Sequence, residues 1–189
     1  VWDLLEPPVR EALAAPRARI EAALGAARPV GVVLDSFEAM YWHFRHIQGR
    51  EAWLTDGPFI ERYAPPLGPG VKERFAWSRA VTDEQFAAGT AFRARFRAHL
   101  LDLLGSDGVL LMPTMPDVAP LIAADDASLE GYRNRAIHLL CIAGLSGFPQ
   151  LSLPLATRLG APLGLSLLGP PGSDRSLVRL AEQVAAHRG

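Results

Sequence analysis

The chain has 189 residues, of which 49% are apolar and 21% are charged, and its formal net charge is -1. This composition supports a packed core and excludes long disorder, a basic nucleic-acid-binding stripe and a solvating acidic tail. No apolar run reaches the roughly 20 residues that span a bilayer, so we expect no membrane partner. Because the chain has no basic stripe, we expect no nucleic-acid partner either. The single cysteine, Cys141, allows no internal disulfide and fits a cytoplasmic location.

The first third of the chain predicts a helix, a strand and a second helix. Val9–Leu24 has helical character, with Pro16 expected to kink or split it. Val30–Leu34 is a short apolar run next to a proline, which predicts a buried strand. The helix that follows is expected to break at Gly57-Pro58.

The middle of the chain begins with a loop rich in proline and glycine over residues 64–70. Thr82 and Gln85 then form a capping-box pattern, which predicts the start of a long helix that ends at Leu104. Val109–Met112 is a second apolar run and predicts another buried strand.

The last third predicts a helix from about Ser128 to Ile142, two strands over Leu151–Leu155 and Leu163–Leu168, and a final helix capped by Asp174. Helices that alternate with short apolar strands indicate an α/β fold, with a mixed β-sheet core flanked by helices. We expect the four apolar runs to be strands of one sheet.

Three groups of residues have two possible interpretations each, one functional and one structural. His43 and His46 share a helix face, but no further ligand has the spacing of a metal site, and packing is favoured. His138 and Cys141 are one turn apart, yet their apolar neighbours favour a buried structural cysteine over a nucleophile. Residues 169–174 precede a helix and could cradle an anion, but their two prolines favour an ordinary cap.

Aromatic residues are concentrated in the middle third of the chain. Core packing is the default interpretation, and a wall for an aromatic or aliphatic amide is the alternative. The residues are Trp42, Trp53, Tyr63, Phe75 and Trp77.

Three segments, residues 107–116, 143–154 and 161–174, occur in an order that resembles the carboxy-terminal signature of the amidase signature family. In that family a strand runs into Pro-Thr-x-Pro, a Gly-x-Pro turn leads to a second strand, and a hairpin leads to a third. The resemblance covers about the last eighty residues. The segment Ser-Gly-Phe-Pro-Gln, which ends in Gln150, resembles the small-amide and arylamide branch of the family. It implies that residues 1–189 are the carboxy-terminal portion of a single amidase domain.

The resemblance also implies acyl transfer to a Ser nucleophile within a Ser-Ser-Lys triad. The chain has nine Ser but no Ser-Ser pair and no Gly-Gly pair, and the context of Lys72 does not match the family's Lys segment. We therefore assign no catalytic residue, no metal and no cofactor to this chain. The expected partners are a small amide substrate and the missing amino-terminal half of the domain, and a homodimer is left open.

Thr114, Met115 and Ser146 are the predicted substrate-binding residues, because they lie at strand ends or in a turn, where open α/β sheets place ligands. We expect them at one sheet edge, facing a common cleft. Two other functions stay open: an amidotransferase A-type subunit that acts on glutamine, and a non-catalytic interaction or scaffold domain.

Overall fold

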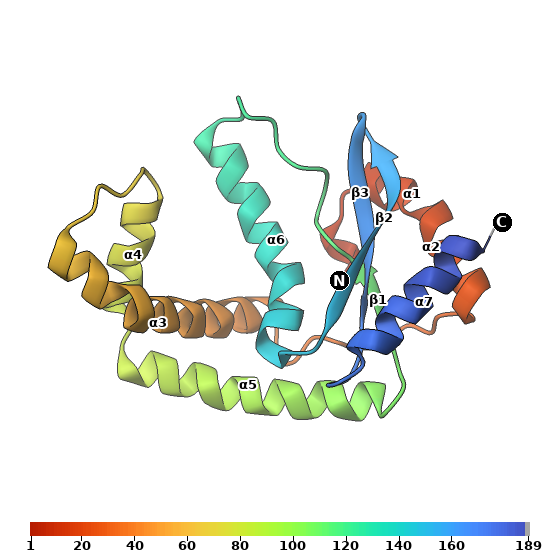
Figure 1. The fold of residues 1–189 in the computed structure, drawn as a ribbon, viewed down its shortest axis with the longest axis horizontal. Coiled ribbons are helices and arrows are strands. Elements are labelled where there is room, and N and C mark those ends of the chain that lie inside the picture. Colours follow the sequence, from red (N-terminus) through yellow and green to blue (C-terminus); the bar gives the residue numbers. More distant parts are fainter. Residues whose placement is uncertain (188–189) are drawn as a thin grey trace.

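A computed structural model describes residues 1–187, which form seven α-helices, one 3-10 turn and a three-stranded sheet. Figure 1 shows the sheet standing between α3, α4, α5 and α6 on one side and α1, α2 and α7 on the other. The helices are α1 (Pro7–Ala12), α2 (Ala14–Leu24), α3 (Phe37–Tyr63), α4 (Val71–Ala80), α5 (Asp83–Leu104), α6 (Asp126–Ser146) and α7 (Asp174–Ala186). The strands are β1 (Leu110–Pro113), β2 (Gln150–Arg158) and β3 (Ala161–Leu168).

The sheet has the order β1-β3-β2, and β3 pairs antiparallel with both neighbours. The α/β class is therefore confirmed, although within residues 1–187 the sheet is purely antiparallel rather than mixed. Because β1 is an edge strand, its second side carries backbone groups that no described strand satisfies.

Side chains on the two faces of β3 belong to two different cores, since successive residues of a strand point to opposite sides. Leu163, Leu165 and Leu167 pack with α1, α2 and α7, whereas Leu168 packs with α3, α5 and α6.

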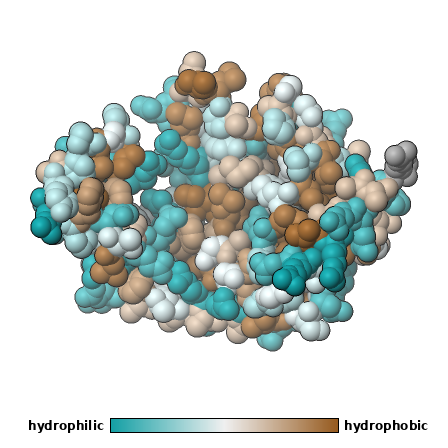
Figure 2. All heavy atoms as spheres, viewed as in Figure 1, coloured by the Kyte–Doolittle hydropathy of each residue, from teal (hydrophilic) through white to brown (hydrophobic). Residues whose placement is uncertain are grey.

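Apolar side chains are exposed on the surface at the top of Figure 2, over the loop between β1 and α6, where Leu121 and Ile122 lie.

Several expectations are confirmed. The first helix is split, with the break at Leu13 rather than at Pro16. Pro16 is the third residue of α2, where a backbone N–H has no intrahelical partner to lose, so the break falls upstream of it. Thr82 and Gln85 form the capping box of α5, which ends at Leu104 with Gly105 as its C-cap.

The prediction of a strand at Val30–Leu34 is wrong. The segment pairs with no strand, and the Gly31 carbonyl lies 3.0 Å from His99 Nε2. Its apolar character comes from core packing, since Val32 is buried against the α3–α5 side of the molecule. A ladder needs a partner strand, and burial alone does not supply one.

The predicted break at Gly57-Pro58 is also wrong, because α3 continues through Pro58 to Tyr63. Gly57 is buried, and a Cβ at this position would lie 2.8 Å from the Trp53 ring, so the helix packs tightly on itself around the proline. Proline here removes one backbone hydrogen bond, and packing against α4 and α5 outweighs that loss.

Three further details differ from the sequence prediction. α4 was not predicted, and α6 extends to Ser146 instead of stopping at Ile142. The cap of α7 is Ser173 rather than Asp174, and it makes no side-chain capping bond. No described helix is both long enough and apolar enough to cross a membrane.

Candidate functional site

One face of the sheet changes from apolar to polar along the strands. Residues directly opposite each other in antiparallel strands point to the same side, and Met112, Ser166 and Ser152 stand opposite one another across the three strands. Leu168 and Met112 lie in the core at one end of this face. Towards the other end, the side chains on this face are polar, at Ser166 and Thr114.

Four of these side chains, Thr114, Gln150, Ser152 and Ser166, form a hydrogen-bonded group that we call the hydroxyl–amide cluster. Ser166 is its centre: Gln150 Nε2 donates to Ser166 Oγ at 2.8 Å, Thr114 Oγ1 lies 2.8 Å from the same atom, and Ser152 Oγ lies 3.3 Å from it. Ser166 is fully buried, Thr114 and Gln150 are half-buried, and Ser152 is exposed. The cluster therefore runs from the sheet interior to the surface.

Gly164 makes room for Thr114 beside β3. The Thr114 backbone N–H donates to the Gly164 carbonyl at 3.1 Å, so the two residues are neighbours across the strands. A Cβ on Gly164 would lie 2.9 Å from the Leu153 carbonyl oxygen and 3.3 Å from Thr114 Oγ1. A larger residue would first clash with the Leu153 carbonyl and would also crowd the Thr114 side chain, which explains the glycine at this position.

The three predicted substrate-binding residues have different positions. Thr114 belongs to the cluster, and Met115 follows it as a half-buried residue in the loop after β1. Ser146 is the last residue of α6 and is fully buried. Its hydroxyl donates to the Ile142 carbonyl at 2.8 Å and accepts from the Phe148 N–H at 3.2 Å, so backbone groups occupy it. A substrate-binding role for the three stays a prediction.

Sequence reasoning missed Ser152 and Ser166 and treated Gln150 only as a branch marker. A signal was present in β2, where Gln150 and Ser152 are separated by two positions and so share one face of an otherwise apolar strand. Ser166 stands between Leu165 and Leu167, and only the pairing register shows that it lies next to Ser152.

The other candidates are structural. Burial raises the pKa of the Cys141 thiol to about 12, so no thiolate forms at neutral pH. His138 Nδ1 lies 2.7 Å from the Asn134 carbonyl oxygen, one helical turn away. Within residues 1–187, no group of three or more His, Cys, Asp or Glu could hold a metal ion.

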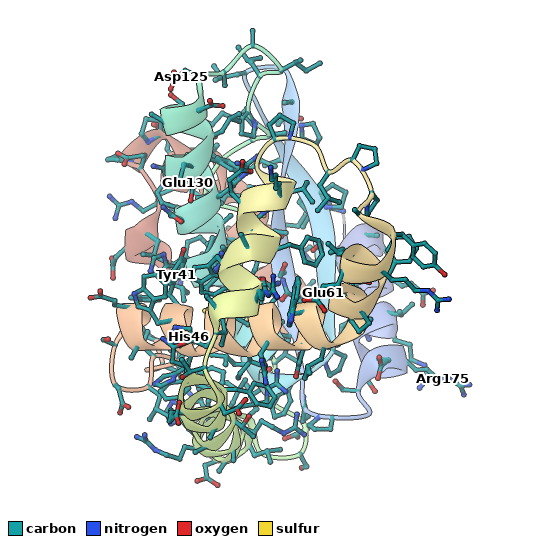
Figure 3. All side chains as sticks on the ribbon, turned by 90° about the vertical axis from the view of Figure 1, so that its left-hand side faces the viewer. Tyr41, His46, Glu61, Asp125, Glu130 and Arg175 are labelled. Carbon is teal, nitrogen blue, oxygen red and sulfur yellow. The ribbon has the colours of Figure 1, made fainter. Side chains whose placement is uncertain are left out.

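The histidines of α3 pack among aromatic rings. His46 is stacked between Trp42 and Trp77, and His43 is stacked on Phe92 with ring centroids 4.4 Å apart. Burial lowers the pKa of both imidazoles, which favours the neutral rings. Figure 3 shows His46 and Tyr41 on α3, and the Tyr41 hydroxyl lies 3.0 Å from Asn134 Oδ1 of α6.

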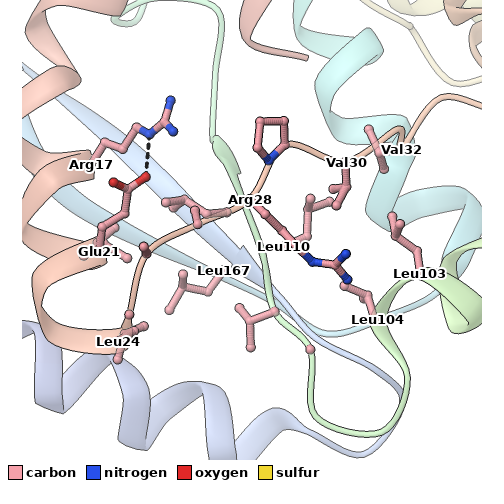
Figure 4. Close-up of a pocket in the computed structure, with 18 of the residues that line it drawn as sticks. Arg17, Glu21, Leu24, Arg28, Val30, Val32, Leu103, Leu104, Leu110 and Leu167 are labelled. Carbon is pink, nitrogen blue, oxygen red and sulfur yellow. Dashed lines mark hydrogen bonds and ion pairs between the residues drawn. The ribbon is translucent and has the colours of Figure 1, made fainter.

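A cavity of about 710 Å³ adjoins the free edge of β1, enclosed by α2, residues 25–32 and the end of α5. Its labelled lining in Figure 4 is mostly apolar, apart from Arg28 and the Arg17–Glu21 ion pair of 2.8 Å. Leu111 and Leu167 in its wall lie on the sheet face opposite the hydroxyl–amide cluster. The cavity is therefore separate from the cluster, and it brings together no nucleophile and base.

Comparison with known proteins identifies the family. The sequence profile named Amidase matches residues 55–178, which is more than half of the chain. The chain belongs to the amidase family. Among curated amidase relatives, Amidase 1 of Arabidopsis thaliana is 36% identical over 153 residues, covering 81% of this chain and 36% of the relative. The A-type subunit of the glutamyl-tRNA(Gln) amidotransferase of Thermus thermophilus is 34% identical over 107 residues, covering 57% of this chain and 22% of that relative.

A solved amidase structure confirms the fold of this amidase chain. It superposes with a TM-score of 0.84 and 26% identity, and the match covers 98% of this chain and 43% of that structure. The chain therefore spans less than half the length of these amidases. Its one lysine, Lys72, is exposed in the first turn of α4.

Proposed function

We propose that this chain forms the substrate side of an amidase that hydrolyses a small carboxamide to a carboxylate and ammonia. In this reaction a Ser hydroxyl attacks the amide carbon, the C–N bond breaks, and ammonia leaves with the proton that the base removed. Water then attacks the acyl-enzyme, which releases the carboxylate and restores the Ser hydroxyl. The observation that carries the proposal is membership of the amidase family, with 36% identity to Amidase 1 of Arabidopsis thaliana.

The catalytic Ser-Ser-Lys triad is assigned to a polypeptide segment outside residues 1–189. An unactivated serine is a weak nucleophile and needs a positioned base. The chain has no Ser-Ser pair, and Lys72 is exposed on α4. We expect neither a metal nor an organic cofactor, because the Ser-Ser-Lys chemistry of the family needs neither.

The test compares this chain alone with the same chain coexpressed with the amino-terminal part of the domain. Release of ammonia is measured from aryl, aliphatic and amino-acid amides. We expect no turnover by the lone chain and turnover by the complete domain. The matched control is Lys72→Met, which should leave the activity of the complete domain unchanged because Lys72 is not the triad lysine.

One result would overturn the assignment of catalysis to another segment: turnover by the lone chain that a Ser substitution within it abolishes.

A glutamine-dependent amidotransferase is the second candidate function, supported by the Thermus thermophilus relative. It predicts copurifying partner subunits and a requirement for glutamine as the amide. A full gene without a Ser-Ser segment would instead favour a non-catalytic scaffold.

A further inference from the structure

Ser166 has more hydrogen-bonding partners than packing alone requires. A buried hydroxyl is costly when it has no partner, and one good hydrogen bond removes most of that cost. Ser166 is fully buried and has three side-chain neighbours within 3.3 Å, two on β2 and a third at the residue that follows β1. A leucine core could be completed more simply, so the cluster calls for an explanation beyond sheet packing.

The hydrogen bonds of the cluster fix the direction of the Gln150 amide. A glutamine side chain has two N–H donors and one carbonyl acceptor. Gln150 Nε2 is held by Ser166 Oγ at 2.8 Å, so the carbonyl oxygen Oε1 is turned away from Ser166. Within residues 1–187 the side-chain hydrogen bond of Gln150 is the one from Nε2 to Ser166, none reaches Oε1, and the side chain as a whole is half-buried.

Although α3, α5 and α6 cover one end of this sheet face, the cluster reaches the surface at Ser152 of β2. The helices that pack on β2 are α1 and α7, and they contact the opposite face, which carries Leu151 and Leu153. Ser152 is exposed, and Pro154, two residues further along β2, is exposed as well. Gln150 shares this strand face with Ser152 and is half-buried, so part of its side chain is reached from the exposed end.

The charge of the cluster selects the kind of ligand. All four side chains are neutral, so neither an ammonium group nor a carboxylate would find a counter-charge in the cluster. Arg158, at the opposite end of β2 from Gln150, is paired with Asp117, with Nη1 2.7 Å from Oδ1, so its charge already has a partner. An uncharged group that donates a hydrogen bond fits the free acceptor Oε1.

We propose that Gln150 Oε1 accepts a hydrogen bond from the N–H of the substrate's uncharged amide, and that Ser166 is a positioning residue that holds Gln150 in this orientation. The inference rests on the proposed amidase function and adds a specificity rule to it. Substrates whose reacting group carries an N–H gain this contact, whereas the ester of the same acid cannot make it. The cluster therefore selects amides over esters.

The test measures kcat/KM of the complete domain for a primary amide and for the methyl ester of the same acid, in wild type and in Gln150→Met. Methionine has a similar volume but removes the carbonyl acceptor. We expect the amide-to-ester ratio to fall about tenfold, the value of one hydrogen bond to a substrate group. Ser166→Ala should lower the ratio in the same direction but less, because Gln150 is then free to rotate.

The amide-to-ester ratio cancels the fraction of folded enzyme, so a partly unfolded variant still gives a readable result. Thr157→Val is the matched control, since Thr157 is an exposed residue of the same strand outside the cluster, and it should leave the ratio unchanged.

Two outcomes overturn the inference and leave the amidase proposal standing: amide and ester rates that fall together in Gln150→Met, or a ratio that does not change. In either case the cluster serves the fold or holds the backbone of another segment. A wild-type domain that hydrolyses neither the amides nor the esters overturns the proposed function, and this inference with it.

Discussion

At two positions inside helices, an aromatic ring of a neighbouring helix leaves room only for glycine. A Cβ at Gly49 of α3 would lie 2.5 Å from Cζ3 of Trp77 in α4, and a Cβ at Gly144 of α6 would overlap the Phe44 ring of α3. Glycine is a poor helix former, so its presence inside two long helices needs a steric reason. These contacts supply it, because they let α4 and α6 approach α3 closely.

We predict that Gly49→Ala lowers the free energy of unfolding of the complete domain by up to about 2 kcal/mol. The gain in helix propensity is about 1 kcal/mol, but overpacking costs about 1–3 kcal/mol, and the Trp77 ring is stacked on His46 and has little freedom to shift. Urea-induced unfolding followed by circular dichroism gives the value.

Gly131→Ala is the matched control for this substitution. Gly131 also lies inside a helix, but the nearest atom to a Cβ there is Arg135 Nη1 at 4.0 Å. Alanine should therefore raise stability by about 0.5–1 kcal/mol. Equal stability of the two alanine variants would show that Trp77 does not restrict position 49.

At the scale of the elements, the β2–β3 hairpin is joined by the two residues Leu159 and Gly160. Arg158 pairs with Ala161, and both loop residues have positive φ, 52° for Leu159 and 77° for Gly160. Positive φ at both positions is typical of a type I′ turn, whose twist matches that of the flanking strands. Leucine is unfavourable in this conformation, and Leu159 is 83% exposed, so packing does not compensate.

We predict that Leu159→Asn stabilises the complete domain by about 0.5–1 kcal/mol, since asparagine tolerates the left-handed conformation far better than leucine. A rise in Tm measured by calorimetry checks the prediction. Gly160→Ala should lower Tm, because alanine at positive φ is strained. A fall in Tm for Leu159→Asn would indicate that Leu159 contacts another part of the complete domain.

At the scale of the whole molecule, the free edge of β1 and the cavity beside it leave strand edge and apolar surface uncovered within residues 1–187. Unpaired edges recruit strands from other chains. We predict that residues 1–189 expressed alone self-associate, with a mass that rises with concentration in light scattering after gel filtration. Coexpression with the amino-terminal part of the domain should give a defined species. A monodisperse monomer of the lone chain would contradict this prediction without affecting the chemical proposal.

The sequence by itself determined those features whose cause is local. The capping box at Thr82 and Gln85, the break of the first helix, and the strands near Val109–Met112, Leu151–Leu155 and Leu163–Leu168 follow from short patterns of caps, prolines and apolar runs. The order of motifs in the last eighty residues also indicated the amidase family, which the comparisons confirm.

Only the tertiary structure decided the features that depend on distant partners. Val30–Leu34 has the composition of a strand but finds no strand to pair with, and α3 passes Pro58 because packing outweighs one lost hydrogen bond. The hydroxyl–amide cluster joins residues of β2 and β3 with the residue that follows β1, and Thr114 and Ser166 are 52 positions apart. Periodicity assigns a residue to a face of its own strand, but the pairing register decides which side chains meet.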